Sequence, residues 1–277
     1  MLKNTFHHIP GIGAGTESGL WKKGLNSWKD IKENNTSAIS AKRLSTLKQH
    51  VDISLEHLGN SHFKYFEEQL PSNLIWRIFP EVRSQTAYLD IETTGLEGWD
   101  KITTIALYDG KEIKTFVNGD NLEHFPEAIS AYGTVVTYNG KCFDVPFIEN
   151  FFNIKMDQVH IDLRYILKSL GYGGGLKACE KKLGIDRGGL DGVDGLIAIQ
   201  LWQDYQRHGN EKALETLLAY NIEDVVNLET LMVMAYNKKL KETPFSQSHQ
   251  ISLPAAPEIE FKADAATVTR LKSNNYY

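Results

Sequence analysis

Short apolar runs separated by segments of helical spacing predict a mixed α/β domain in the middle of the chain. Five runs have strand length, at about 86–92, 101–108, 112–117, 134–138 and 159–163, and helices are expected at about 121–131, at 143–152 and beyond 163. Asp109 and Gly110, between the second and third runs, tolerate positive φ and predict a tight hairpin. We therefore expect three antiparallel strands followed by βα units, in one mixed sheet with helices packed on it.

The composition of the flanking segments divides the rest of the chain. Residues 1–33 are rich in Gly and Trp and predict short helices with tight turns, and residues 34–82 carry helical spacing. The α/β domain is expected to occupy 83–241. Residues 242–277 are rich in Pro, Ser and Ala, so we expect a poorly ordered tail.

Two carboxylates mark the end of the first predicted strand. Asp90 and Glu92 are two residues apart, so they share one face of the strand while Leu89 and Ile91 face the opposite side. Folding alone does not call for two like charges here. A hard divalent cation does, because it takes oxygen ligands.

Two further acidic positions lie later in the chain. Asp144 falls at the start of the helix after the fourth strand, where it is either a site residue or a helix-capping acid. Tyr220 and Asp224 are four residues apart on one face of a predicted helix, where the alternative is a packed Tyr and a solvent-facing Asp. Glu223 points about 100° away from Asp224 and cannot share its site.

Charge and cysteine content limit the class of protein. The 277 residues carry a net charge of −5, so a nucleic-acid partner would be held by a local groove or by metal ions. Two cysteines, Cys142 and Cys179, exclude a disulfide framework and a four-cysteine zinc site. The first residues lack the core of a signal peptide and no apolar run is long enough to span a membrane, so we expect a cytoplasmic location.

The three acidic segments together resemble the motifs of a known family. Residues 89–95 read Leu-Asp-Ile-Glu-Thr-Thr-Gly, residues 139–144 Asn-Gly-Lys-Cys-Phe-Asp, and residues 220–224 Tyr-Asn-Ile-Glu-Asp. In order and spacing they resemble the DEDD exonucleases of the ribonuclease H-like superfamily. The Tyr-x-x-x-Asp pattern is similar to the tyrosine subtype, since Ala219 stands where the histidine subtype has His. With the Trp-Arg-Ile-Phe-Pro run at 76–80, the chain most resembles the YprB-like ribonuclease H domain family over about 66–235.

The resemblance implies a ribonuclease H-like fold and a two-metal mechanism. Two divalent cations, Mg²⁺ or Mn²⁺, would lie about 4 Å apart. Asp90 would bridge them, Glu92 and Asp224 would complete the shell of the ion that activates water, and Asp144 would act mostly through coordinated waters. Tyr220, with an ordinary pKa near 10, would orient the attacking water instead of acting as a base.

Substrate contacts are expected around these motifs. Leu96 is the candidate wedge between terminal bases, and Phe143 is a candidate for stacking. Further contacts are expected at Thr93, Gly95, Asn139 and Lys177. Lys177 begins a basic patch that either contacts substrate phosphates or is a solvated helix face; its other members are Lys181, Lys182 and Arg187.

The Gly-Ile-Gly sequence at 11–13 resembles the hairpin of helix-hairpin-helix motifs, which bind phosphates through backbone N–H groups. The alternative is an N-terminal packing element. Asp162 and Asp194 are expected to be helix N-caps, with a supporting role at the metal site as the alternative for Asp162.

These patterns predict a metal-dependent 3′–5′ exonuclease acting on single-stranded nucleic-acid ends, with the 3′ polarity implied by the resemblance alone. The alternatives are a structure-selective endonuclease on the same site and a non-catalytic nucleic-acid-binding module. No residue pattern identifies a sensor for the ribose 2′-hydroxyl, so DNA and RNA both stay open as substrates. No membrane contact is expected, and protein partners are not indicated.

Overall fold

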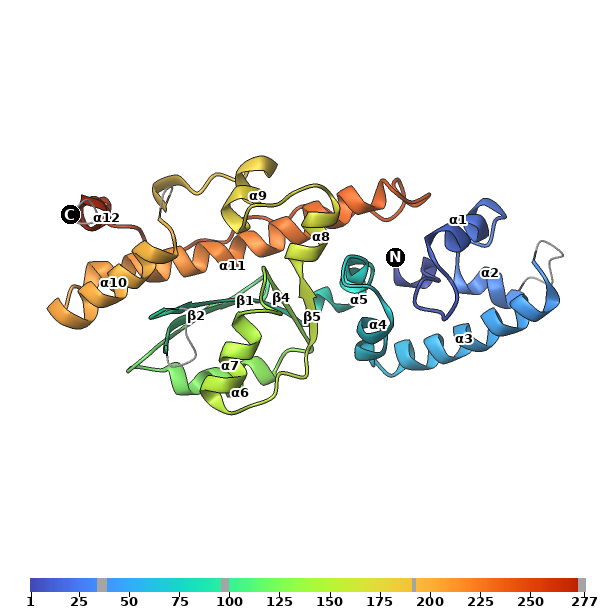
Figure 1. Ribbon diagram of the computed structural model, residues 1–277, viewed down its shortest axis with the longest axis horizontal. Coiled ribbons are helices and arrows are strands. Elements are labelled where there is room, and N and C mark those ends of the chain that lie inside the picture. Colours follow the sequence, from blue (N-terminus) through green and yellow to red (C-terminus); the bar gives the residue numbers. More distant parts are fainter. Residues whose placement is uncertain (34–38, 96–99, 191–192, 274–277) are drawn as a thin grey trace. The chain divides into compact units, whose positions relative to one another are not determined.

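The chain folds into two units, and each draws on two separate stretches of sequence. The computed structural model describes residues 1–33, 39–95, 100–190 and 193–273. One unit comprises Met1–Ser84 with Ala235–Ile251, and the other comprises Gln85–Met234 with Ser252–Tyr277 (Figure 1). The predicted α/β domain lies in the second unit.

A five-stranded mixed sheet forms the centre of the second unit. Its strands are β1 Thr86–Thr93, β2 Ile102–Tyr108, β3 Ile113–Val117, β4 Thr134–Thr137 and β5 Val159–Asp162. They are ordered β3-β2-β1-β4-β5, with antiparallel pairing among β1, β2 and β3 and parallel pairing of β4 with β1 and β5. The expected ribonuclease H-like mixed sheet is confirmed.

The hairpin between β2 and β3 forms where it was predicted. Gly110 has φ +89°, and the Asp109 side chain accepts hydrogen bonds from the backbone N–H groups of Lys111 and Glu112, both at 2.9 Å. The Asp109 carboxylate therefore accepts hydrogen bonds from two backbone N–H groups of the turn, and Gly110 supplies the positive φ that other residues avoid.

Helices cover both faces of the sheet. The helices α6 Phe125–Ser130 and α7 Asp144–Phe152 lie on one side, and α11 Glu211–Leu240 lies on the other (Figure 1). Leu89 and Ile91 of β1 belong to the apolar cluster on the α6 and α7 side. The residues that alternate with them along β1 therefore face α11. In the described part of the chain, no helix combines the length and apolar character needed to cross a membrane.

The remaining helices of this unit follow β5. They are α8 Leu163–Ser169, α9 Leu176–Leu183, the short η5 Gly188–Leu190 and α10 Gly195–His208. Asp162 and Asp194 cap α8 and α10 as predicted, since each side chain accepts a hydrogen bond from the backbone of its helix's first turn.

The C-terminal segment differs from the poorly ordered tail expected there. It contains α12 Ala265–Ser273, whose Val268 and Leu271 are buried in the same apolar cluster as α10. Arg270 of α12 also forms an ion pair with the buried Asp204 of α10. Two apolar residues three apart and one ion pair, in which Asp204 is buried and Arg270 is exposed, dock this short helix, and the overall Pro, Ser and Ala content does not reveal them.

The first unit is helical. Its elements are η1 Leu2–Asn4, α1 Ala14–Lys22, α2 Trp28–Glu33, α3 Ala41–Gly59, α4 Phe63–Gln69, η2 Ile75–Ile78 and α5 Phe79–Val82. The short η3 Arg83–Gln85 lies at the boundary between the units, and the last residues of α11 also belong to the first unit. Gly13 is the N-cap of α1, and Gly11 has φ +79°. Contact of this segment with nucleic acid stays a prediction.

A buried ion pair links α1 to the Trp-Arg-Ile-Phe-Pro run. Arg77 Nη1 lies 2.8 and 2.9 Å from the two carboxylate oxygens of Glu17, and both side chains are buried. Glu17 also accepts the backbone N–H of Phe6 at 2.7 Å. The guanidinium lies 5.6 Å from the Trp76 ring centroid and 5.7 Å from that of Trp21. One charge pair thus joins three segments of the first unit.

Breaking this pair from one side is expected to destabilise the unit strongly. Arg77→Met leaves the buried Glu17 charge without its cation and should lower the free energy of unfolding by about 3–5 kcal/mol. The double variant Glu17→Gln/Arg77→Met removes both charges and should recover most of that loss. Denaturant unfolding measures both, and equal destabilisation by the single and double variants would contradict the argument.

Candidate metal centre

Three carboxylates converge between β1 and α11. Strand alternation turns Asp90 and Glu92 toward the α11 side of the sheet, and Asp224 reaches them from α11. One ligand oxygen from each of the three lies within 4.8 Å of the others. Two segments more than 130 residues apart in the sequence therefore supply one acidic group.

Asp144 lies beside this group but outside it. It is the first residue of α7, only 5% exposed, and its Oδ1 accepts the backbone N–H of Ile91 at 3.3 Å. Its negative charge contributes to the raised pKa of Asp90. It is thus a first-turn acid bonded to the backbone of β1, and it also lies close enough to act electrostatically on the three converging carboxylates.

Burial makes the ionised state of these carboxylates costly. Desolvation is the largest cause in every case, and it raises the pKa of Asp144 to about 7 and that of Asp224 to about 6. The pKa values of Asp90 and Glu92 lie well above their usual range, through burial and then through the Asp224 charge. The cluster therefore needs positive charge or hydrogen-bond donors to stay ionised near neutral pH.

Asn221 donates one such hydrogen bond, and sequence reasoning did not assign it a role. Its Nδ2 lies 2.7 Å from Asp90 Oδ2, and its Oδ1 accepts from the Thr104 hydroxyl of β2 at 3.1 Å. The side chain is fully buried. Asn221 therefore positions the Asp90 carboxylate from α11, and its place next to Tyr220 in the third motif was the available signal.

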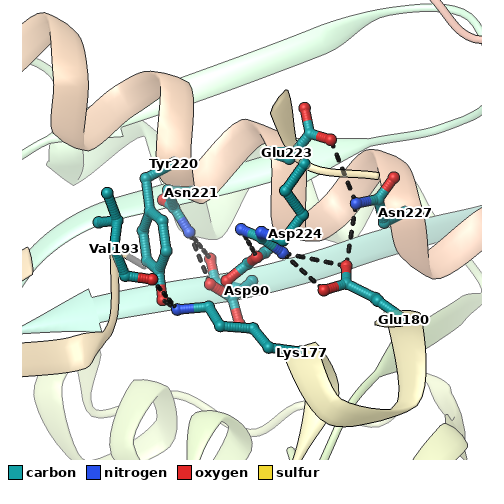
Figure 2. Close-up of polar contacts among 10 residues, drawn as sticks. Asp90, Lys177, Glu180, Val193, Tyr220, Asn221, Glu223, Asp224 and Asn227 are labelled. Atoms are coloured by element: carbon teal, nitrogen blue, oxygen red, sulfur yellow. Dashed lines mark hydrogen bonds and ion pairs between the residues drawn. The ribbon is translucent and has the colours of Figure 1, made fainter. Parts of the chain in front are cut away.

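Arg187 supplies a buried cation to the centre. Its guanidinium forms an ion pair with Asp224 through Nη2 and contacts both oxygens of Glu180 through Nη1, at 3.0 and 2.8 Å. Asn227 Nδ2 donates to Glu180 at 2.9 Å, on the side of Asp224 away from Tyr220 (Figure 2). Burial lowers the pKa of Arg187, but the Asp224 and Glu180 charges outweigh it and raise the pKa above its ordinary value.

Lys177 supplies the second cation. Its Nζ donates to the Tyr220 hydroxyl and to the Val193 carbonyl, the latter at 2.5 Å, as Figure 2 shows. The ammonium lies 4.1 Å from the centroid of the Tyr220 ring. Two members of the predicted basic patch, Lys177 and Arg187, thus turn toward the carboxylates. They do not lie on a solvated helix face, which was the alternative interpretation of the patch.

Tyr220 stays protonated in this setting. Burial raises the pKa of its hydroxyl far above 10, and the charges of Asp224, Glu92 and Asp90 raise it further.

Glu223 lies apart from the centre and accepts a hydrogen bond from Asn227 at 3.3 Å, as its position on the helix predicted.

The expected contact residues Thr93 and Gly95 lie at the end of β1 and just after it. The Thr93 hydroxyl donates to the Gly95 carbonyl at 2.5 Å. A Cβ at Gly95 would lie 2.5 Å from the Asp100 carboxylate, so this position is tight against its neighbour. Leu96, the expected wedge, falls outside the described residues.

Asn139 and Phe143 occupy the loop between β4 and α7. Asn139 has φ +70°, and its backbone N–H donates to Asp162 Oδ1 at 2.8 Å. Asp162 therefore holds this loop in addition to capping α8. Phe143 is half-buried, with its ring centroid 5.6 Å from that of Phe147. No described contact links Phe143 to the carboxylates, so its stacking role stays a prediction.

The donor set fits a hard divalent cation. All the converging ligands are carboxylate oxygens, the type that Mg²⁺ and Mn²⁺ prefer, and their raised pKa values show a deficit of positive charge that an ion would remove. Asp90, Glu92 and Asp224 would hold such an ion, with Asp144 close by.

Fold and site together define an α/β protein with an acidic centre at the end of its first strand. The family model described as RNase_H superfamily matches residues 87–236, which is more than half of the chain, and the chain belongs to this superfamily. Searches of curated proteins and of solved structures gave no significant match. Membership supports a nuclease-type enzyme that acts on nucleic acid and uses divalent metal.

Arg187 is expected to compete with metal for Asp224. A cation ligated by Asp224 must displace the guanidinium, so Arg187→Gln should tighten Mn²⁺ binding about tenfold, as removal of one nearby positive charge predicts. Isothermal titration calorimetry measures the affinity. Glu180→Gln/Arg187→Gln removes the buried pair together and should also bind more tightly, whereas the exposed Arg207→Gln should match wild type. Unchanged or weaker binding in both Arg187 variants would refute competition.

The raised carboxylate pKa values predict an unusual pH dependence of stability. Between about pH 4 and 7 the folded metal-free protein holds protons on Asp144 that the unfolded chain releases, so this group stabilises at low pH and the contribution is lost as pH rises. Asp144→Asn should therefore gain stability relative to wild type across that window, by about 2–4 kcal/mol. Thermal unfolding in EDTA measures this difference at each pH.

A difference between Asp144→Asn and wild type that stays constant with pH would contradict this expectation. With Mn²⁺ present the wild-type trend should reverse, because ligation requires ionised carboxylates and strengthens as pH rises.

Proposed function

We propose that the protein is a metal-dependent 3′–5′ exonuclease that hydrolyses single-stranded DNA or RNA ends with two divalent cations, Mg²⁺ or Mn²⁺. The observation that carries the proposal is the convergence of Asp90, Glu92 and Asp224, with Asp144 beside them and Tyr220 one helical turn before Asp224. Membership of the RNase_H superfamily supports the nuclease class.

The four carboxylates would hold the ions, which when bound supply an activated water and neutralise charge on the scissile phosphate. Tyr220 keeps its proton at neutral pH, so it orients the attacking water by hydrogen bonding and does not act as a base. Lys177 already contacts the Tyr220 hydroxyl oxygen. Its ammonium fixes that oxygen and places a positive charge where the substrate phosphate would arrive.

The tyrosine subtype of the DEDD exonucleases is the subclass we propose. Tyr220 precedes Asp224 by four residues, both side chains are buried at the centre, and Ala219 occupies the histidine subtype's position. The YprB-like family stays a proposal, based on the Trp-Arg-Ile-Phe-Pro run and the third motif. The 3′ polarity follows from this subclass.

A non-catalytic nucleic-acid-binding module is the second candidate. The observation in its favour is that Arg187 and Lys177 already offset part of the acidic charge from within the chain. A module could keep the centre folded by these contacts alone. It would not need Tyr220 and all four acids in their present arrangement.

Asp90→Asn should separate the two candidates. Loss of this ligand should cost several kcal/mol of transition-state stabilisation, which is about a 10³-fold loss of cleavage rate, while nucleic-acid binding is retained or strengthened. Cleavage is measured on 5′-labelled single-stranded DNA and RNA with Mg²⁺ and with Mn²⁺. A ladder shortening from the 3′ end is expected for wild type, and a circular single strand should resist.

Asp157→Asn, in an exposed loop, is the matched control and should cleave as wild type does. Cutting of the circular strand would instead indicate an endonuclease. Wild-type protein that binds the oligonucleotides but leaves them intact with both metals would establish the binding module and refute the exonuclease.

A further inference from the structure

A cavity of about 640 Å³ lies between α8, the start of α9 and the loop after β4. Arg164 and Lys168 of α8 line it, with Tyr138 and Asn139 from the loop after β4 and Tyr172 before α9. None of the described residues that line it is acidic. In a chain with a net charge of −5, this is a locally basic hollow with aromatic walls.

Its two cations come from one helix face. Arg164 and Lys168 are four residues apart in α8, so their side chains project in the same direction, and both are exposed. Arg164 Nη1 donates to the Asn139 side-chain oxygen, which fixes the guanidinium beside the β4–α7 loop. The positive charges are thus accessible to a ligand.

Two elements join this cavity to the metal centre. Leu176 lines the cavity at the start of α9, and the next residue, Lys177, reaches the Tyr220 hydroxyl. Asn139 lines the cavity from a loop that ends at Asp144. The start of α9 and the loop from Asn139 to Asp144 therefore each line the cavity at one end and carry a residue of the metal centre or its surroundings at the other. A strand of nucleotides in the cavity would lie next to the carboxylates.

Three glycines, Gly173, Gly174 and Gly175, line part of the cavity without side chains. Gly174 and Gly175 have φ of +103° and +89°, a region that favours glycine, and they connect α8 to α9 without bulk. Tyr138 and Tyr172 supply aromatic surface on which bases can stack, and the Tyr138 hydroxyl lies 3.6 Å from the Sγ of the buried Cys179.

We propose that this cavity binds the phosphates and bases of the single-stranded nucleic acid that adjoin the scissile bond. The inference rests on the proposed function for the identity of the strand. The described lining carries two positive charges and no acidic residue, which favours phosphates, and the tyrosines accept any base, so the subsite holds the strand without reading its sequence. Arg164 and Lys168 are the phosphate contacts.

The salt dependence of binding tests this assignment independently of cleavage. Affinity for a fluorescent single-stranded oligonucleotide is measured by anisotropy in Ca²⁺ over a series of salt concentrations. Each phosphate contact on a single strand contributes about −0.7 to the slope of log K against log salt, so Arg164→Ala/Lys168→Ala should make the slope shallower by about 1.4. The affinity of this double variant for the oligonucleotide at low salt should also fall below that of wild type.

The matched control removes one Arg and one Lys from exposed positions outside the cavity. Lys155→Ala/Arg207→Ala changes the net charge equally and should leave the slope within error of wild type. An unchanged slope in the cavity variant, or an equal change in both variants, would overturn the subsite. Binding of inorganic phosphate with no effect on the oligonucleotide slope would also overturn it and indicate a small-anion site.

Absence of cleavage by wild type would refute the exonuclease but leave this binding measurement intact. The two proposals can therefore fail separately.

Discussion

Keeping several carboxylates ionised within a buried space is the constraint on which the rest of the site depends. Asp90, Glu92 and Asp224 meet within 4.8 Å of one another, and Asp144 adds its charge from the start of α7. Burial raises all four pKa values, and the charge of Asp224 raises those of Asp90, Glu92 and Asp144 further. The structure offsets this cost with the hydrogen bond from Asn221 and with the cations Arg187 and Lys177, and divalent ions would offset it more completely.

The fold brings these groups together through simple geometric rules. Alternation along β1 sends Leu89 and Ile91 into the apolar cluster beside α6 and α7, and it sends the two acids toward α11. The helical repeat then places Tyr220 and Asp224 on one face, while Asn221 reaches Asp90 from the same helix. The site therefore forms only when α11 packs on the sheet at the position that places Asp224 beside the two acids of β1.

Much of this could be predicted from the sequence, because the signals are local. The strand pattern, the Asp-Gly hairpin and the spacing of the residues within each acidic motif each depend on a few neighbouring residues. The observed hairpin and the observed strand order agree with the first two. The role of Arg187 could not be predicted, since its partners Glu180 and Asp224 come from two other segments. The docking of α12 was missed for a similar reason, because composition does not reveal two buried apolar residues and one ion pair to a distant segment.

The central claim is that the carboxylates of β1, α7 and α11 form a divalent-cation site. Anomalous scattering from a crystal soaked in Mn²⁺ tests it most directly. We predict manganese peaks at about 2.0–2.2 Å from oxygens of Asp90, Glu92 and Asp224, with the Arg187 guanidinium displaced from Asp224. A centre without manganese, and with Arg187 still paired to Asp224, at a concentration that supports cleavage would contradict the account.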